Sequence, residues 1–122
     1  MGFKLATAIV VDDSRLMRVK IKDILTKHNI EVIGEANNGI EAIKLYQKLR
    51  PDLMTLDILM PELDGLEVLK QIMASHSDAK VIIISCAITR ERVMKALSLG
   101  AKNFIVKPFA APTLQKAIDE II

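Results

Sequence analysis

The pattern of apolar and polar positions changes its period repeatedly along this chain of 122 residues. Short apolar runs rich in β-branched residues alternate with stretches in which apolar residues recur every three or four positions. The runs predict strands at residues 6–11, 30–36, 53–57, 80–85 and 103–106, each followed by an amphipathic helix. A regular alternation of five strands with five helices indicates an α/β fold with a parallel sheet covered on both faces.

Polar residues and special backbone residues mark the expected ends of these helices. Ser14, Asn38 and Asp64 stand where a side-chain oxygen can cap the first turn of a helix, and the fourth helix is expected to begin at Thr89. Gly100 suits a left-handed stop, and Pro112 suits a first helical turn. The helical positions expected to face the core are Met17, Ile21, Ile24, Leu25, Ile40, Ile43, Tyr46, Leu49, Leu66, Leu69, Ile72, Met73, Val93, Met94, Leu97, Leu114, Ala117, Ile118 and Ile121.

Polar side chains follow four of the five predicted strands at the point where each strand ends. They are Asp12 and Asp13, Asp57, Ser85 and Lys107. The carboxyl ends of parallel strands meet at one edge of a sheet, which is where open α/β sheets place their sites. Two unit charges about 4 Å apart repel by roughly 4 kcal/mol at an effective dielectric constant near 20, so clustered carboxylates need a cation.

Oxygen ligands of this kind suit Mg²⁺, and Lys107 offers a second positive charge. A carboxylate can act as a nucleophile toward phosphorus, and a metal ion neutralises the charge that develops. We therefore predict a phosphoryl-transfer site in which Asp57 receives the phosphoryl group and Ser85 donates a hydrogen bond.

Composition narrows the class of protein further. Apolar residues make up 51% of the chain, but no apolar run approaches the roughly 18 residues of a membrane span. The N-terminus does not fit a signal peptide, and a single cysteine, Cys86, cannot form an internal disulfide. We expect a cytoplasmic protein in which Cys86 is a small buried hydrophobic residue. The net charge of +2 gives no argument for binding nucleic acid or a membrane.

Several of these residues, in this order and spacing, resemble the receiver domain of bacterial response regulators over essentially the whole chain. The resemblance is carried by Asp12-Asp13, Asp57-x-x-Met60-Pro61-x-x-Asp64-Gly65, Ser85 and Lys107-Pro108-Phe109. It implies a single receiver domain spanning residues 1–122, with a doubly wound sheet in the strand order 2-1-3-4-5. It also implies a cis peptide bond between Lys107 and Pro108, and the cis form has a low free-energy cost only before proline.

The resemblance further implies a chemistry. A sensor histidine kinase would carry a phosphohistidine, and Asp57 would attack its phosphorus. Asp13 would ligate Mg²⁺ directly, Asp12 would act mainly through water, and Asp57 and the backbone carbonyl of Leu59 would complete the protein ligands. Ser85 and Lys107 would then bind the phosphoryl oxygens.

A switch and a set of partners are implied as well. Phe104 stands at the position whose ring turns inward as Ser85 moves toward the phosphoryl group, although a plain core role also fits Phe104. The chain looks most like a chemotaxis-type single-domain regulator, which binds a flagellar motor switch component through its fourth helix, fifth strand and fifth helix. Three cations would make part of that face basic: Arg90, Arg92 and Lys95. A phosphatase is a further possible partner, and we expect a monomer.

The resemblance also implies that two positions flanking the phosphorylation site, which vary in the family, affect how long the phosphoryl group persists. Leu59 and Ala87 carry side chains that cannot orient an attacking water. We therefore expect slow spontaneous loss of phosphate.

The same residues bear on four other functions. An aspartyl-nucleophile phosphohydrolase would need a second Asp two residues after the first, where this chain has Leu59. A flavin- or nucleotide-binding module would need a Gly- or Thr-rich loop after the first strand, where Asp12 and Asp13 would repel a phosphate. The intact acid cluster argues against a non-catalytic interaction domain. A receiver domain cut from a larger regulator, such as a DNA-binding transcription factor, stays open as an alternative.

Overall fold

The computed structural model describes residues 4–86 and 89–122, and in this part of the chain five strands alternate with five helices. The strands are β1 (Ala6–Val11), β2 (Ile30–Ala36), β3 (Leu53–Leu56), β4 (Val81–Ser85) and β5 (Asn103–Val106). The helices are α1 (Arg15–Lys27), α2 (Gly39–Leu49), α3 (Gly65–Ser75), α4 (Arg90–Ser98) and α5 (Ala111–Ile121). All pairs of neighbouring strands are parallel, and their order is β2-β1-β3-β4-β5. The predicted fold and strand order are confirmed.

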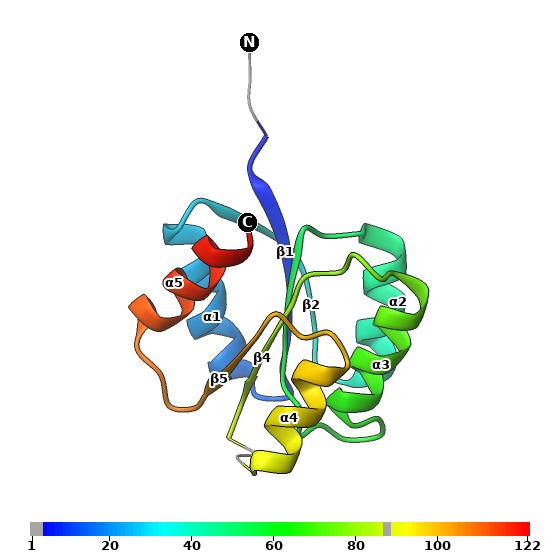
Figure 1. Cartoon of the computed structure of the whole chain (residues 1–122). Coiled ribbons are helices and arrows are strands. Elements are labelled where there is room, and N and C mark those ends of the chain that lie inside the picture. Colours follow the sequence, from blue (N-terminus) through cyan, green and yellow to red (C-terminus); the bar gives the residue numbers. More distant parts are fainter. Residues whose placement is uncertain (1–3, 87–88) are drawn as a thin grey trace.

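The helices lie in two layers, one on each face of the sheet (Figure 1). Helices α1 and α5 cover one face, and their buried side chains form a core cluster with alternate residues of the strands, including Val10 and Ile84. Helices α2, α3 and α4 cover the other face, where Val11 and Ile83 point. Alternate residues of one strand point to opposite faces of a sheet, so the continuous apolar run of β4 supplies both cores.

Most helix ends follow the expected capping chemistry. The side chains of Ser14, Asn38, Asp64 and Thr89 each accept a hydrogen bond from a backbone N–H in the first turn of α1, α2, α3 and α4. Gly100 follows α4 with φ of +112°, a left-handed conformation that glycine adopts without steric cost. The peptide bond between Lys107 and Pro108 is cis, as the resemblance implies.

The inward face was predicted wrongly for parts of two helices. Ile40 in α2 and Met94 and Leu97 in α4 were expected in the core, but each is exposed. Helical periodicity identifies an apolar stripe but does not show how much of that stripe the neighbouring elements cover. The residue of α4 that is buried against the rest of the protein is small, Ala96.

Cys86 corrects another expectation. It was predicted to be buried, but it lies exposed directly after β4. The strand ends at the buried Ser85, so the next residue leaves the sheet for the surface.

Strand β2 forms one edge of the sheet and carries an irregularity in its pairing with β1. Ala8 pairs with Val32 but Ile9 pairs with Gly34, so one extra residue is accommodated in β2. The two glutamates of this strand, Glu31 and Glu35, are exposed.

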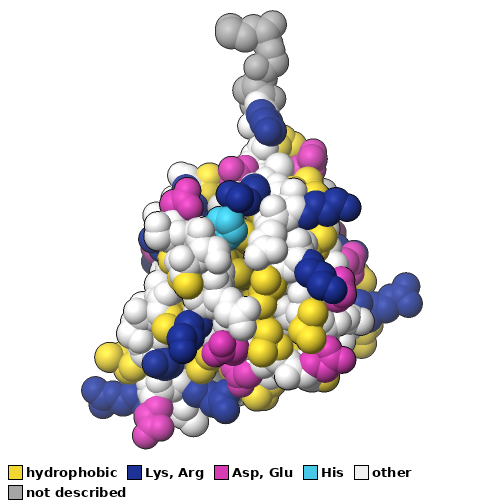
Figure 2. Space-filling model, turned by 90° about the vertical axis from the view of Figure 1, so that its right-hand side faces the viewer, with side chains coloured by type: hydrophobic (Ala, Val, Ile, Leu, Met, Phe, Trp, Pro, Cys, Tyr) yellow, Lys and Arg dark blue, Asp and Glu magenta, His cyan; other side chains and the backbone are white. Residues whose placement is uncertain are grey.

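The surface offers no simple clue to a ligand on the side that carries α2 and α3. Figure 2 shows hydrophobic side chains near the middle of this face, with both signs of charge interspersed around them. Among the described residues, no helix is both long and apolar enough to cross a membrane.

Candidate functional site

The carboxyl ends of the strands lie together at one end of the sheet, opposite the end at which β1 begins (Figure 1). The residue directly after each of three strands still forms a backbone hydrogen bond with the neighbouring strand, and this bond fixes its position. These bonds run from Asp12 N–H to the Ala36 carbonyl, from Asp57 N–H to the Val11 carbonyl and from Lys107 N–H to the Ser85 carbonyl. The backbones of Asp12, Asp57 and Lys107 are therefore held by the sheet itself.

Three carboxylates meet at this edge. Oxygens of Asp12, Asp13 and Asp57 lie within 4.8 Å of one another. Asp12 and Asp57 are buried, at 1% and 4% exposure, whereas Asp13 is exposed. The structure thus brings together residues that are up to 45 positions apart, and one of the three opens to solvent.

Lys107 supplies the cation of this cluster. Its Nζ lies 2.6 Å from Oδ2 of Asp12 and 3.1 Å from Oδ2 of Asp57. The other oxygens of these two carboxylates accept backbone N–H groups, from Ser14 at 2.9 Å and from Leu59 at 3.3 Å. Both buried carboxylates are therefore oriented by an ammonium on one side and a peptide group on the other.

Burial and charge act against each other in this pair. Burial raises the pKa of the Asp12 carboxyl above its ordinary value, and the hydrogen bond from Lys107 opposes that rise. For Lys107, burial alone would lower the pKa of the ammonium, but the hydrogen bond to Asp12 and the charge of Asp57 outweigh it. The pKa of Lys107 is raised, so this lysine carries its charge at neutral pH.

The remaining predicted site residues surround the cluster. Ser85 is buried at the end of β4, paired with Val106 and so next to Lys107. The side chain of Leu59 is 45% exposed. Phe104 is partly buried against the core cluster on the α2–α3–α4 side, which fits a core role, and its switching role stays a prediction. Ala87 lies outside the described residues.

The loop between β3 and α3 approaches the strand end very closely. Gly65 donates its N–H to the Ile58 carbonyl at 2.8 Å, and a Cβ atom added to Gly65 would lie 2.1 Å from the Asp57 carbonyl oxygen. A side chain of any size would force this loop and Asp57 apart. Glycine in the Asp64-Gly65 pair is therefore required by space.

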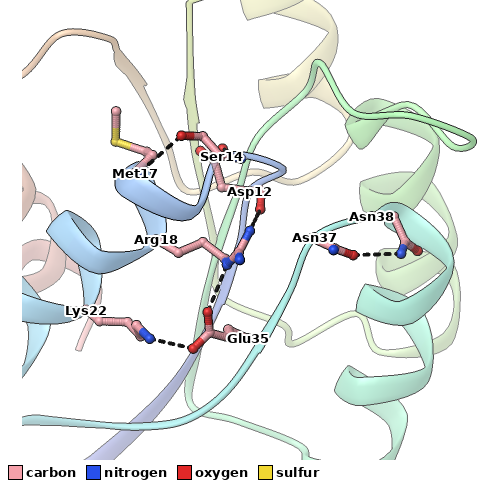
Figure 3. A network of polar contacts seen from close by, with 8 residues as sticks. All are labelled: Asp12, Ser14, Met17, Arg18, Lys22, Glu35, Asn37 and Asn38. Carbon is pink, nitrogen blue, oxygen red and sulfur yellow. Dashed lines mark hydrogen bonds and ion pairs between the residues drawn. The ribbon is translucent and has the colours of Figure 1, made fainter.

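Two residues of α1 contact the site loops and were not predicted. Arg18 donates from Nη1 to the Asp12 carbonyl at 2.7 Å (Figure 3). Lys20 donates to the Phe109 carbonyl at 2.8 Å, with its Nζ 4.3 Å from the centre of the Phe109 ring. The helical pattern places both residues on polar faces of α1, but nothing local indicates that those faces lie beside the two loops.

The donor set fits Mg²⁺. Hard carboxylate oxygens converge, one carboxylate is open to solvent, and the ion typically takes one or two carboxylates together with water. The cluster of Asp12, Asp13 and Asp57 is typical of a Mg²⁺ site.

A doubly wound sheet with this acid cluster and a lysine at its carboxyl edge defines a phosphoryl-accepting signalling domain. A family model described as the response regulator receiver domain matches residues 8–119. The chain therefore belongs to the response regulator receiver domain family. It is a phosphoryl-accepting receiver of the CheY type, a signalling protein and not a conventional enzyme.

Individual relatives agree with this assignment. The chemotaxis protein CheY of Listeria monocytogenes is 48% identical over 112 residues, which cover 92% of this chain and 94% of that protein. In the crystal structure of a CheX–CheY–BeF₃–Mg²⁺ complex from Borrelia burgdorferi, one chain superimposes with a TM-score of 0.93 at 33% identity, covering 95% of this chain and 88% of that one. A protein-glutamate methylesterase of Archaeoglobus fulgidus is 47% identical over 106 residues, but these are only 30% of its length. Similar domains thus occur both alone and within longer proteins.

Proposed function

We propose that Asp57 is the residue that accepts the phosphoryl group, from the phosphohistidine of a sensor histidine kinase. The observation that carries this proposal is the position of its carboxylate, which has one oxygen 3.1 Å from the Lys107 ammonium and an oxygen within 4.8 Å of one from the exposed Asp13. Asp13, Asp57 and the carbonyl of Leu59 would hold Mg²⁺, and Asp12 would act on it mainly through water. The whole of residues 1–122 is one receiver domain.

The geometry suits an in-line displacement by a carboxylate. One oxygen of Asp57 forms a bond to phosphorus while the phosphorus–nitrogen bond breaks, and its electron pair returns to the imidazole of the donor. The N–H of Leu59 and the ammonium of Lys107 keep the carboxylate oriented before the attack. Lys107 and the Ser85 hydroxyl then bind oxygens of the transferred group. A bound Mg²⁺ would neutralise charge on those oxygens.

Intact-protein mass spectrometry after incubation with acetyl phosphate and Mg²⁺ tests the assignment. Wild type gains the mass of one phosphoryl group, and Asp57→Asn gains none. Asp52→Asn is the matched control, because Asp52 lies just before β3, at the other end of the same strand, where it accepts hydrogen bonds from Thr7. Phosphorylation of Asp57→Asn to the wild-type level would overturn the proposal.

We further propose that phosphorylation controls the face formed by α4, β5 and α5, and that a flagellar motor switch component binds there. This rests on the CheY relatives that match over most of their length and on the exposed apolar residues Met94, Leu97 and Val106 of this face. A purified motor switch component should bind the phosphorylated chain more tightly than the unmodified chain. Met94→Asp should weaken that binding, whereas Leu16→Asp on α1 should leave it unchanged.

A further inference from the structure

Arg18 links the site loop to the edge strand of the sheet. Its guanidinium donates from Nη1 to the carbonyl of Asp12 at 2.7 Å and from Nε to Oε1 of Glu35 in β2 at 2.8 Å (Figure 3). The side chain is 14% exposed, although it belongs to a surface helix. The other carboxylate oxygen of Glu35 pairs with Lys22, one turn further along α1.

The atom that Arg18 holds is well placed to control the neighbouring acid. The carbonyl of Asp12 belongs to the peptide group that joins Asp12 to Asp13, and that group is planar. Fixing this carbonyl therefore also fixes the direction of the Asp13 N–H and the position of its Cα. Asp12 has further restraints from Ala36, Ser14 and Lys107, but Asp13 is the exposed member of the cluster.

Glu35, the carboxylate to which Arg18 binds, keeps its negative charge. The hydrogen bonds from Lys22 and Arg18 lower the pKa of Glu35, so its carboxylate is charged at neutral pH. Arginine suits this bridge because its planar fork presents several N–H groups in fixed directions, one toward the carboxylate and one toward the carbonyl.

We propose that Arg18 is a positioning residue for the acid pair: by holding the Asp12 carbonyl toward Glu35, it sets the place of Asp13 and so the affinity of the site for a divalent cation. This inference rests on the proposed role of Asp13 as a metal ligand. Partners one step outside a metal site typically change its affinity 10-fold to 100-fold when they are removed.

A purely electrostatic role of Arg18 predicts the opposite change in Mg²⁺ affinity when Arg18 is replaced. If its positive charge only repelled a cation, Arg18→Gln would tighten Mg²⁺ binding and Glu35→Gln would weaken it. Positioning predicts that both variants weaken Mg²⁺ binding, because both break the same bridge. The two substitutions remove opposite charges, so their comparison separates the two explanations.

Isothermal titration of the full chain with Mg²⁺, without any phosphodonor, measures the effect. Arg18→Gln should raise the dissociation constant about 10-fold, and Glu35→Gln should raise it by a smaller factor. Arg18→Lys, which keeps the charge but has a single donor nitrogen, should recover part of the loss. Lys22→Gln is the matched control, because Lys22 contacts Glu35 and not the Asp12 carbonyl, and it should stay within about 2-fold of wild type.

Two further measurements make each outcome decisive. The Asp13 amide resonance of the metal-free protein should shift in Arg18→Gln and not in Lys22→Gln, and urea unfolding confirms that each variant is folded. If Asp13→Asn binds Mg²⁺ as wild type does, the proposed metal site fails, and the inference fails with it. If Asp13→Asn loses Mg²⁺ but Arg18→Gln keeps wild-type affinity and an unshifted Asp13 amide, only the inference about Arg18 is overturned.

Discussion

Helices α1 and α4 flank the same site from opposite faces of the sheet, but they are attached to the molecule very differently. Helix α1 buries Ile21, Ile24 and Leu25 and donates side-chain hydrogen bonds to two of the site loops. Among the α4 side chains that the structure describes, Ala96 is the buried one, and Met94 and Leu97 are exposed.

The side of the site next to α1 is therefore held by more contacts than the side next to α4. Segments with few buried apolar contacts open at a lower free energy than the global core. The loops that carry Asp12 and Phe109 are the ones that side chains of α1 hold. The face proposed for output lies over the helix with the weaker attachment, where a small change in contact energy can shift the conformation.

The largest expected contrast is in stability. Leu25→Ala should lower the free energy of unfolding by about 2–5 kcal/mol, because the side chain is fully buried and leaves a cavity. Met94→Ala should change it by less than about 0.5 kcal/mol. Urea denaturation of the two variants checks this, and equal losses would remove the contrast between α1 and α4.

A smaller effect concerns the ion pairs on the two sides. Lys107→Met should cost about 3 kcal/mol at neutral pH, because it leaves two buried carboxylates unpaired. Arg92→Met on α4 should cost less than about 1 kcal/mol, since Arg92 and Asp64 form a more exposed pair 3.6 Å apart. Urea unfolding at neutral pH provides both values.

The Lys107 contribution should also depend on pH with a definite sign. The pKa of Lys107 is raised in the folded state, so its stabilisation is complete below pH 10.5 and is lost as pH rises through the folded-state pKa. The stability difference between wild type and Lys107→Met should therefore be constant from neutral pH to 10.5 and shrink above it. A stability difference between wild type and Lys107→Met that grew above pH 10.5 would contradict this sign. The difference between wild type and Arg92→Met should not shrink in the same pH range.

The smallest effect tests the second link between α1 and the site. Lys20→Met removes the hydrogen bond to the Phe109 carbonyl and the contact with the Phe109 ring, and should cost about 1 kcal/mol. Lys95→Met on the exposed surface of α4 is its control, with a change below about 0.5 kcal/mol. Equal effects in urea denaturation would mean that α1 does not brace the Phe109 loop.

Much of the fold could be predicted because its signals are local. The bounds of β1, β2 and β5 agree with the apolar runs, and three helix caps were indicated by single polar residues. The third strand was predicted one residue too long, through Asp57. Its N–H does continue the bonding to Val11, but its side chain leaves the apolar pattern for the site.

The errors and omissions share a physical cause, because each depends on which elements meet in space. Helical period could not show that α4 leaves Met94 and Leu97 uncovered. The bond from Lys20 to Phe109 joins residues 89 positions apart, and the bridge from Arg18 requires β2 to lie beside α1. Strand ends, by contrast, converge in any parallel sheet, which is why the meeting of Asp12, Asp13, Asp57 and Lys107 could be expected without coordinates.

The extra residue in β2 affects the tendency of this protein to aggregate at high concentration. An edge strand exposes unpaired N–H and C=O groups, which can recruit a strand from another chain and begin aggregation. The shift between Val32 and Gly34 breaks the regular spacing of those groups, and the exposed Glu31 adds a negative charge to the same strand. The open side of β2 is therefore a poor template for a sixth strand.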